Sequence, residues 1–184
     1  VLFEAAPRLG GQLLLAARAS WRKDVTGIID WRAAELARLG VTVRLNHYAE
    51  ADAVIAERPD VVIVATGGVP DIDWISGIEH ASSVWDVISG AVPLTGEVLV
   101  YDGTGRHPGP QAAEFASGEG RAVQLVSCDA QVAQELTYAE RVIWKKRLSE
   151  LGVATLPDHE IVSLAREGNR IRATFRNLTT TALI

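Results

Sequence analysis

The chain has 184 residues, of which 48% are hydrophobic and 22% charged, and its net charge is −5. This balance is typical of a globular protein, and an acidic chain without a basic block argues against nucleic-acid binding. No apolar run reaches the roughly 20 residues of a membrane span and no signal-peptide pattern is present, so we expect a cytoplasmic protein. The single cysteine, Cys128, excludes a disulfide framework and an intrachain cysteine cluster. We interpret it as a small buried hydrophobe at a strand end, and we expect no metal site.

The first residues form a short apolar run that ends in Glu4. This pattern predicts a buried parallel strand whose last carboxylate faces a ligand. In a doubly wound dinucleotide site, the second strand ends in such an acid, and a first strand with a Gly-rich turn lies roughly 20 residues earlier. Because Glu4 is the fourth residue, we expect the chain to start inside a nucleotide-binding fold and to be a piece of a larger protein.

A tight turn with Arg8, Gly10, Gly11 and Gln12 follows, and it leads into an apolar helix over residues 13–19. Paired glycines let backbone amides approach a phosphate or a flavin ribose, and Arg8 adds positive charge. A plain strand-to-helix turn is the alternative interpretation. The pattern then predicts a helix over 26–39, a strand over 41–45 and a small helix over 49–57.

Residues 61–68 predict a fully buried parallel strand with small residues at its end. Thr66 and Gly67 would let a ring or a phosphate lie on the strand end. The region after it lacks periodicity, and we place the boundary between two domains near residues 90–96. The predicted domains are 1–92, an incomplete FAD- or ADP-binding domain, and 93–184.

A second strand-turn-helix-strand unit covers residues 97–127, with its turn over 102–110. Gly103 and Gly105 supply two glycines of a dinucleotide turn, and Asp129 lies where a ribose-binding acid would. Pro108 occupies the third glycine position, where a proline removes an amide from the phosphate cradle. We interpret His107, beside Arg106, as an exposed and inert loop histidine.

The last third of the chain predicts a helix over 137–151 with Trp144 and Leu148 on one face. Strands over 153–156, 160–165 and 170–176 follow, the last with Ile171, Ala173 and Phe175 inward. The predicted fold class is α/β, with two Rossmann-like three-layer units built on parallel sheets, the first truncated at its N-terminus.

Several motifs together carry a family resemblance. They are the acid at Glu4, the pair Gly10-Gly11 followed by Gln12-Leu13, the strand over 61–68, the run over 102–109, the run over 111–115 and the run over 133–136. The chain resembles the C-terminal region of the NADH:flavin oxidoreductase family, which includes trimethylamine dehydrogenase and 2,4-dienoyl-CoA reductase.

The resemblance implies a larger flavin-dependent oxidoreductase. Its N-terminal barrel, with FMN and an iron–sulfur cluster, would hold the catalytic groups and be the main partner of this region, so we expect no catalytic residue here. The first unit would hold FAD or ADP, and the second unit binds NAD(P)H in the reductases. The residues implied for the cofactors are Glu4, Arg8, Gly10, Gly11, Gln12, Thr66, Gly67, Gly103, Gly105 and Asp129.

Two hypotheses remain open at this point. In the first, the chain is the FAD- and NAD(P)-binding region of a flavin oxidoreductase. In the second, it is a non-catalytic module that holds ADP or stays empty, within an amine dehydrogenase or demethylase that passes electrons to an electron-transfer flavoprotein. The departure at Pro108 puts the NAD(P)H role in question, and the loop over 102–110 discriminates between the two.

Overall fold

The computed structural model describes residues 1–184, which form two compact units, Val1–Val69 (unit 1) and Pro70–Ile184 (unit 2). The sequence places the boundary later, between residues 92 and 93. The difference has a physical cause: Ile75 is buried in one cluster with Val126, Ile161 and Phe175. Residues that follow Val69 are therefore part of the core of unit 2.

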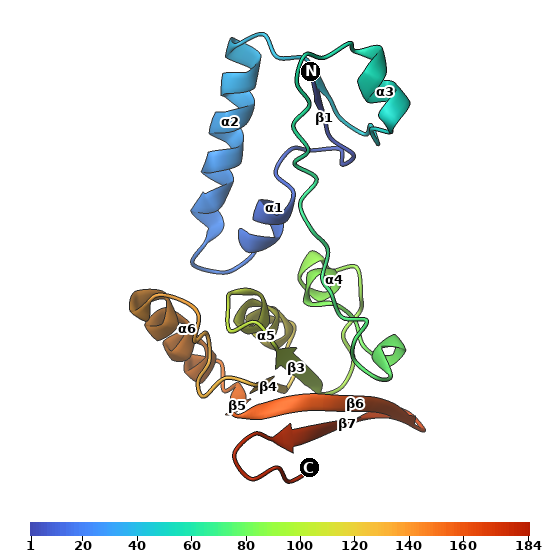
Figure 1. The fold of residues 1–184 in the computed structure, drawn as a ribbon. Coiled ribbons are helices and arrows are strands. Elements are labelled where there is room, and N and C mark those ends of the chain that lie inside the picture. The colour runs from blue at the N-terminus through green and yellow to red at the C-terminus, as the bar shows by residue number, and fades with distance from the viewer. The chain divides into compact units, whose positions relative to one another are not determined.

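Unit 1 contains a small parallel sheet and three helices (Figure 1). Strand β1 (Leu2–Phe3) pairs in parallel with β2 (Val43–Arg44), as the apolar pattern predicts. The side chain of Ile29, on α2, is 5% exposed and anchors that helix. The helices are α1 (Gln12–Ala16), α2 (Thr26–Arg38) and α3 (Ala51–Ala56), with a 3-10 turn, η1 (Lys23–Val25), before α2.

The prediction of a buried strand over 61–68 is wrong for this chain. These residues belong to no strand, and Val61, Val62, Ile63 and Val64 are 75%, 53%, 85% and 79% exposed. A strand with apolar residues on both faces needs neighbouring strands to pair with and layers to cover it. No segment of the chain pairs with this one.

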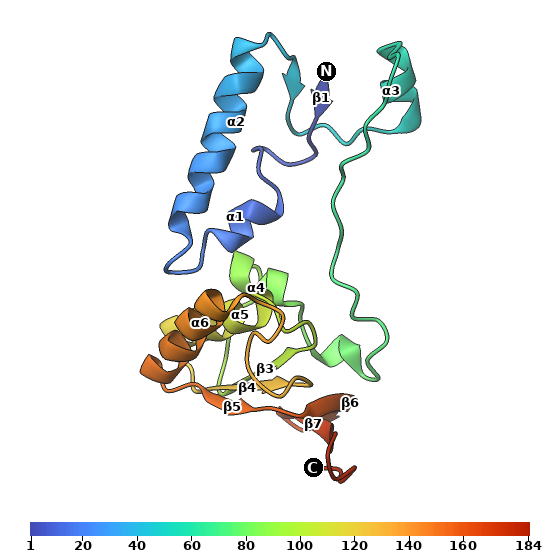
Figure 2. The ribbon, with the colours of Figure 1, turned by 60° about the vertical axis from the view of Figure 1, so that its left-hand side comes forward.

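Unit 2 has three layers around a parallel sheet of order β3-β4-β5. Figures 1 and 2 show α5 and α6 on one face of that sheet and the antiparallel pair β6–β7 on the other. The third layer is thus a hairpin rather than helices. The strands are β3 (Val98–Asp102), β4 (Val123–Ser127), β5 (Ala154–Leu156), β6 (His159–Glu167) and β7 (Arg170–Asn177).

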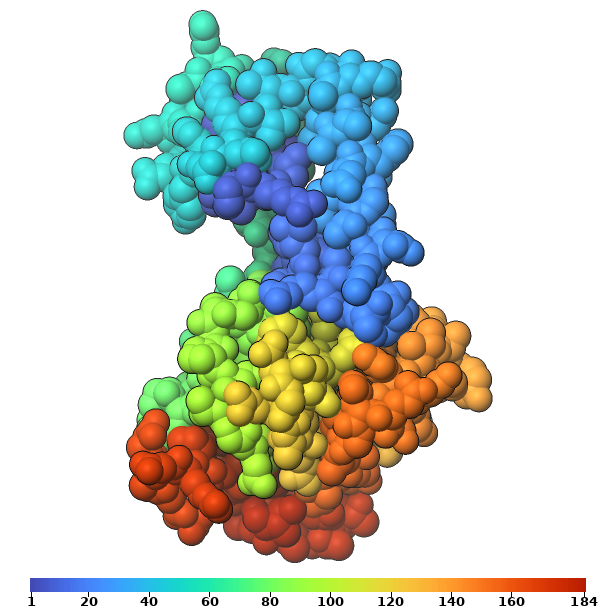
Figure 3. All heavy atoms as spheres, turned by 180° about the vertical axis from the view of Figure 1, so that it is seen from behind, coloured from blue at the N-terminus to red at the C-terminus, as the bar shows by residue number.

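Two shorter helical segments precede the sheet: a 3-10 turn, η2 (Ile78–His80), and α4 (Val84–Ser89). Helix α4 packs against α5, and the atoms of α4 (green) and α6 (orange) flank those of α5 (yellow) in Figure 3. Phe175 of β7 faces the core at 4% exposure, whereas Ile171, predicted to point inward, is 39% exposed. Ile171 lies opposite Arg166 next to the hairpin turn, four residues from Phe175.

The long helices of unit 2 have clear start signals. Helix α5 (Pro108–Gly118) begins with a proline, which needs no amide partner in the first turn, and so starts three residues before the predicted position. Helix α6 (Tyr138–Glu150) begins with a capping box between Thr137 and Glu140. Trp144 and Leu148 lie on its buried face, as predicted. None of the helices has the length and hydropathy that a membrane span requires.

Candidate functional site

Glu4 lies directly after β1, at the carboxyl end of the unit 1 sheet. Its backbone continues the ladder, because its amide donates to Arg44 O at 3.0 Å and its carbonyl accepts from the His47 amide at 2.9 Å. Its Oε1 accepts the Ala6 amide at 2.8 Å, and Oε2 makes no hydrogen bond within the protein. The half-buried carboxylate therefore keeps one free oxygen at the strand end.

The two glycines of the first turn have different surroundings. Gly10 has a φ of 129° and lies against Ile29, where an added Cβ would come within 2.6 Å of Ile29 Cδ1. Gly11 has a φ of 48°, and an added Cβ would meet nothing within 4 Å. Gly10 thus serves the packing of α2, whereas Gly11 leaves an open surface before α1.

The structure brings Gln12 to the end of the segment over 61–68. Gln12 Nε2 donates to Gly68 O at 3.2 Å, and it lies 3.4 Å from the position of a Cβ on Gly67. The first turn and the small residues after Val64 are therefore in contact. Arg8 instead forms an exposed ion pair with Asp30 at 3.5 Å. Thr66 is exposed.

The turn of unit 2 is organised around Asp102, the last residue of β3, whose side chain the sequence did not single out. Asp102 is 2% exposed. Its Oδ1 accepts hydrogen bonds from the Thr104 amide at 3.0 Å, the Thr104 hydroxyl at 2.9 Å and the Gly105 amide at 3.1 Å. Its Oδ2 is buried without a partner. Burial raises the pKa of Asp102, against the lowering effect of these bonds.

The glycines of this turn are packed by protein atoms. A Cβ on Gly105, at a φ of 62°, would collide with Asp129 Oδ2 and lie 3.1 Å from Glu135 Cγ. A Cβ on Gly109 would lie 2.6 Å from both Cβ and Cγ of Asp102. Burial, and secondarily the charge of Glu135, raises the pKa of Asp129. The structure therefore brings Gly105 and Asp129 together, as the sequence suggested, but in direct contact.

His107 is not the exposed and unpartnered residue that the sequence suggested. Trp144, which is fully buried, donates its indole N–H to His107 Nδ1 at 3.0 Å. On the other side of the ring, His107 Nε2 lies 3.4 Å from Glu140 Oε1. The two partners come from α6, so the sequence offered no local signal for them. His107 connects the start of α5 to α6.

Cys128 follows β4 and is half-buried. Burial, together with the charge of Asp129, raises the pKa of its thiol. Burial also raises the pKa of the neighbouring Tyr101 to about 12. A thiol kept protonated is a poor nucleophile, which agrees with a packing role.

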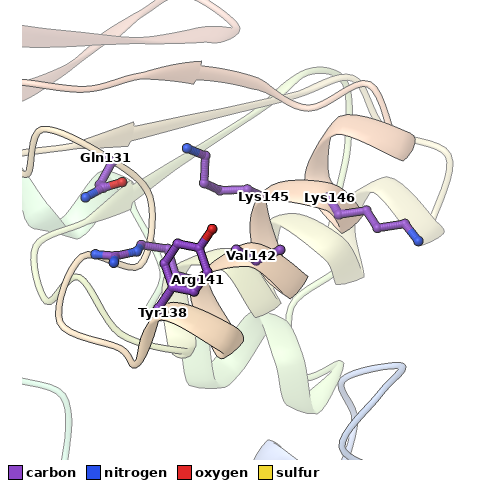
Figure 4. A pocket seen from close by; sticks show the side chains of 6 residues that line it. All are labelled: Gln131, Tyr138, Arg141, Val142, Lys145 and Lys146. Atoms are coloured by element: carbon purple, nitrogen blue, oxygen red, sulfur yellow. The ribbon is translucent and has the colours of Figure 1, made fainter.

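A surface pocket of about 330 Å³ lies over α6. Figure 4 shows Tyr138 and Arg141 side by side in it, with Lys146 pointing away. Three cations, Arg141, Lys145 and Lys146, line it with Gln131, Tyr138 and Val142. None of the site residues predicted from the sequence lines this pocket, so the candidate site remains at the strand ends.

Two curated relatives match almost the whole chain. A multifunctional alkene reductase/demethylase from Caballeronia cordobensis is 42% identical over 178 residues, which are 96% of this chain and 26% of that protein. A probable N-methylproline demethylase from Rhizobium meliloti (strain 1021) is 38% identical over 94% of this chain and 26% of that protein. The chain spans about a quarter of the length of these relatives. No family model matches the chain.

Among solved structures, a 2-naphthoyl-CoA reductase matches 99% of this chain and 27% of its own, with a TM-score of 0.86 at 23% identity. This similarity shows that the chain has the fold of one region of that structure. Over almost its whole length the chain is similar to one region of these oxidoreductases, in agreement with the resemblance to the NADH:flavin oxidoreductase family.

Two contacts were not predicted from the sequence: the hydrogen bonds of Asp102 to its own turn and the hydrogen bond between Trp144 and His107. Only the first has a recognisable sequence pattern. Asp102 ends an apolar strand directly before Gly103-Thr104-Gly105, which is the same acid-after-strand pattern that pointed to Glu4. A short acid followed by a turn predicts an Asx-type bond to its own backbone. The contact of Trp144 with His107 spans 37 residues and had no such signal.

Proposed function

We propose that this chain is the nucleotide-binding region of a larger flavin-dependent oxidoreductase. Unit 1 holds the adenosine part of FAD or ADP at the carboxyl end of β1. The observation that carries the proposal is the free Oε2 of Glu4 at a parallel strand end, next to the open turn at Gly11. A carboxylate so placed accepts hydrogen bonds from the two hydroxyls of a ribose.

The residues present fit that group in two further respects. Gly11 leaves space for a ligand to approach the backbone. Gln12 fixes the backbone at Gly67 and Gly68, where small residues leave room for a cofactor. The flavin, when bound, supplies the redox chemistry. In this chain Glu4 would orient the ribose, and no residue of the chain is proposed to act on substrate.

A direct test substitutes Glu4→Gln in the intact protein. Glutamine keeps an oxygen for the Ala6 amide but replaces the free oxygen with an amide donor. We expect the affinity for ADP, measured by calorimetry on nucleotide-stripped protein, to fall about 10-fold or more, the value of one hydrogen bond to a charged group. Glu57→Gln, whose carboxylate pairs with Arg44 at 2.7 Å, is the matched control. Equal affinity in the wild type and Glu4→Gln would remove Glu4 from the site.

The apolar side chains of residues 61–64 are exposed, and we expect other parts of the intact protein to cover them. We propose that a strand outside this chain pairs with them, as parallel sheets require. Hydrogen exchange should be markedly slower for amides 61–65 in the intact protein than in the isolated 184-residue chain. Identical exchange in both would contradict the pairing.

The names of the relatives favour a reductase or an amine demethylase as the activity of the whole protein. Whether unit 2 takes part by binding NAD(P)H separates the two hypotheses. The carboxyl-filled turn at Asp102 favours the second, in which unit 2 is a structural and partner-docking module that binds no nicotinamide nucleotide at this turn.

A further inference from the structure

The turn over 102–110 has the chain position of a phosphate-binding turn but few donors to offer. Such a turn binds a pyrophosphate through unpaired backbone N–H groups at a helix N-terminus. Here the Thr104 and Gly105 amides both donate to Asp102 Oδ1. The Arg106 amide donates to Thr104 Oγ1 at 3.3 Å. Three consecutive amides of the turn are therefore already bound within it.

The start of α5 removes two further donors. Pro108 and Pro110 have no N–H group, and both lie in the first turn of the helix. Gly109, between them, is buried against the Asp102 side chain rather than open to a ligand. The close approach that a glycine permits is therefore used by Asp102 itself.

The negative charge around the turn also disfavours the binding of a pyrophosphate. The carboxyl groups of Asp102 and Asp129 and the side chain of Glu135 surround Gly105, and carboxylates repel a pyrophosphate. The exposed Arg106 is the cation of the turn itself. Asp102, between the turn amides and the N-terminal end of α5, occupies the position that favours negative charge.

From this geometry we infer that Asp102 is a built-in occupant of the anion position. Its carboxyl group closes the unit 2 turn to the pyrophosphate of a dinucleotide, and it is the residue that determines this specificity. The inference concerns unit 2 and does not depend on the nucleotide site proposed for unit 1.

The test uses the intact protein and ADP-ribose, which carries an adenosine pyrophosphate but cannot reduce a flavin. Hydrogen exchange is followed separately in peptides covering 1–12 and 102–110. In the wild type, ADP-ribose at about 10 mM, enough to slow exchange about 10-fold at a site of millimolar Kd, should leave exchange over 102–110 unchanged. In Asp102→Ala the Thr104 and Gly105 amides should exchange faster without ligand and about 10-fold slower once ADP-ribose is added, since the freed amides bind the pyrophosphate.

Asp102→Asn is the matched control, because its amide oxygen still accepts the turn amides, so it should gain no binding. Slower exchange over 102–110 in the wild type on adding ADP-ribose would overturn the inference, as would a folded Asp102→Ala protein that gains none. If the alanine variant does not fold, the wild-type result alone decides whether the turn is closed. Changes confined to residues 1–12 report on unit 1 alone, so the two proposals fail separately.

Discussion

Glu4 and Asp102 are two acids at the carboxyl ends of parallel strands, one in each unit, and their environments differ. Glu4 directly follows β1 and Asp102 is the last residue of β3, and each accepts the amide two residues further on. Glu4 is half-buried and keeps one oxygen free, whereas Asp102 is 2% exposed and binds three donors of its own turn. The comparison teaches that a carboxylate at a strand end can bind a ligand only if the turn that follows leaves one of its oxygens accessible.

Side-chain length explains the difference. The short side chain of Asp102 reaches its own turn and no further, and Gly109 lets α5 start directly against it. The longer Glu4 is followed by a wider loop, and α1 begins only after Gly11. An acid at a strand end is therefore accompanied by an accessible carboxylate oxygen in unit 1 and by a turn bonded to the carboxylate in unit 2.

The largest effect on this comparison should come from Gly109→Ala. The added methyl would lie 2.6 Å from Cβ and Cγ of Asp102, which its hydrogen bonds hold in place. Overpacking at so rigid a contact should lower the free energy of unfolding of unit 2 by about 3 kcal/mol, measured by urea denaturation. Gly118→Ala, in the same helix with nothing within 4 Å, is the control and should be neutral or slightly stabilising. Equal effects of the two substitutions would show that the Asp102–Gly109 contact is loose.

An intermediate effect should appear in the pH dependence of stability. The pKa of Asp102 is raised by burial, so the folded state binds its proton more readily than the unfolded state. The contribution of Asp102 to the free energy of unfolding should therefore fall as pH rises from the unfolded value near ~3.9 through the folded pKa. Asp102→Asn should remove this decline in urea denaturation series across pH, while Asp73→Asn, at an exposed position of unit 2, should retain it. A wild-type decline that persists in Asp102→Asn would assign it to other groups.

The smallest effect on stability should come from Arg8→Ala. The ion pair of Arg8 with Asp30 is exposed at both ends, and such pairs contribute less than about 0.5 kcal/mol. If Arg8 also attracts a phosphate, the affinity for ADP should fall about 10-fold in Arg8→Ala. Asp30→Ala breaks the same ion pair but keeps the cation, so it should not weaken ADP binding. Weakening by both substitutions to the same extent would mean that the ion pair, rather than the cation, matters.

Most helices and strands could be predicted from the spacing of apolar residues in the sequence, because that spacing determines which face of each element is buried. The strands of unit 2 and the buried pair Trp144 and Leu148 are examples. The strand expected over 61–68 could not be predicted reliably, because a parallel strand depends on neighbours distant in sequence. The candidate site of unit 1 followed from the acid and the glycines, whereas the filling of the unit 2 turn depended on three-dimensional contacts with Asp129, Glu135 and Gly109.

The burial of Ile75 has a consequence for how such proteins are recombined. Ile75 packs with Val126, Ile161 and Phe175, and Ser76 forms a parallel bridge with Ser163. The segment over 70–92 is therefore inherited with the second unit, although it precedes the first strand of its parallel sheet. A chimaera that exchanges the second unit between relatives should be joined at Val69, because a junction at residue 92 would pack the sheet and hairpin of one parent around the position 75 side chain of the other.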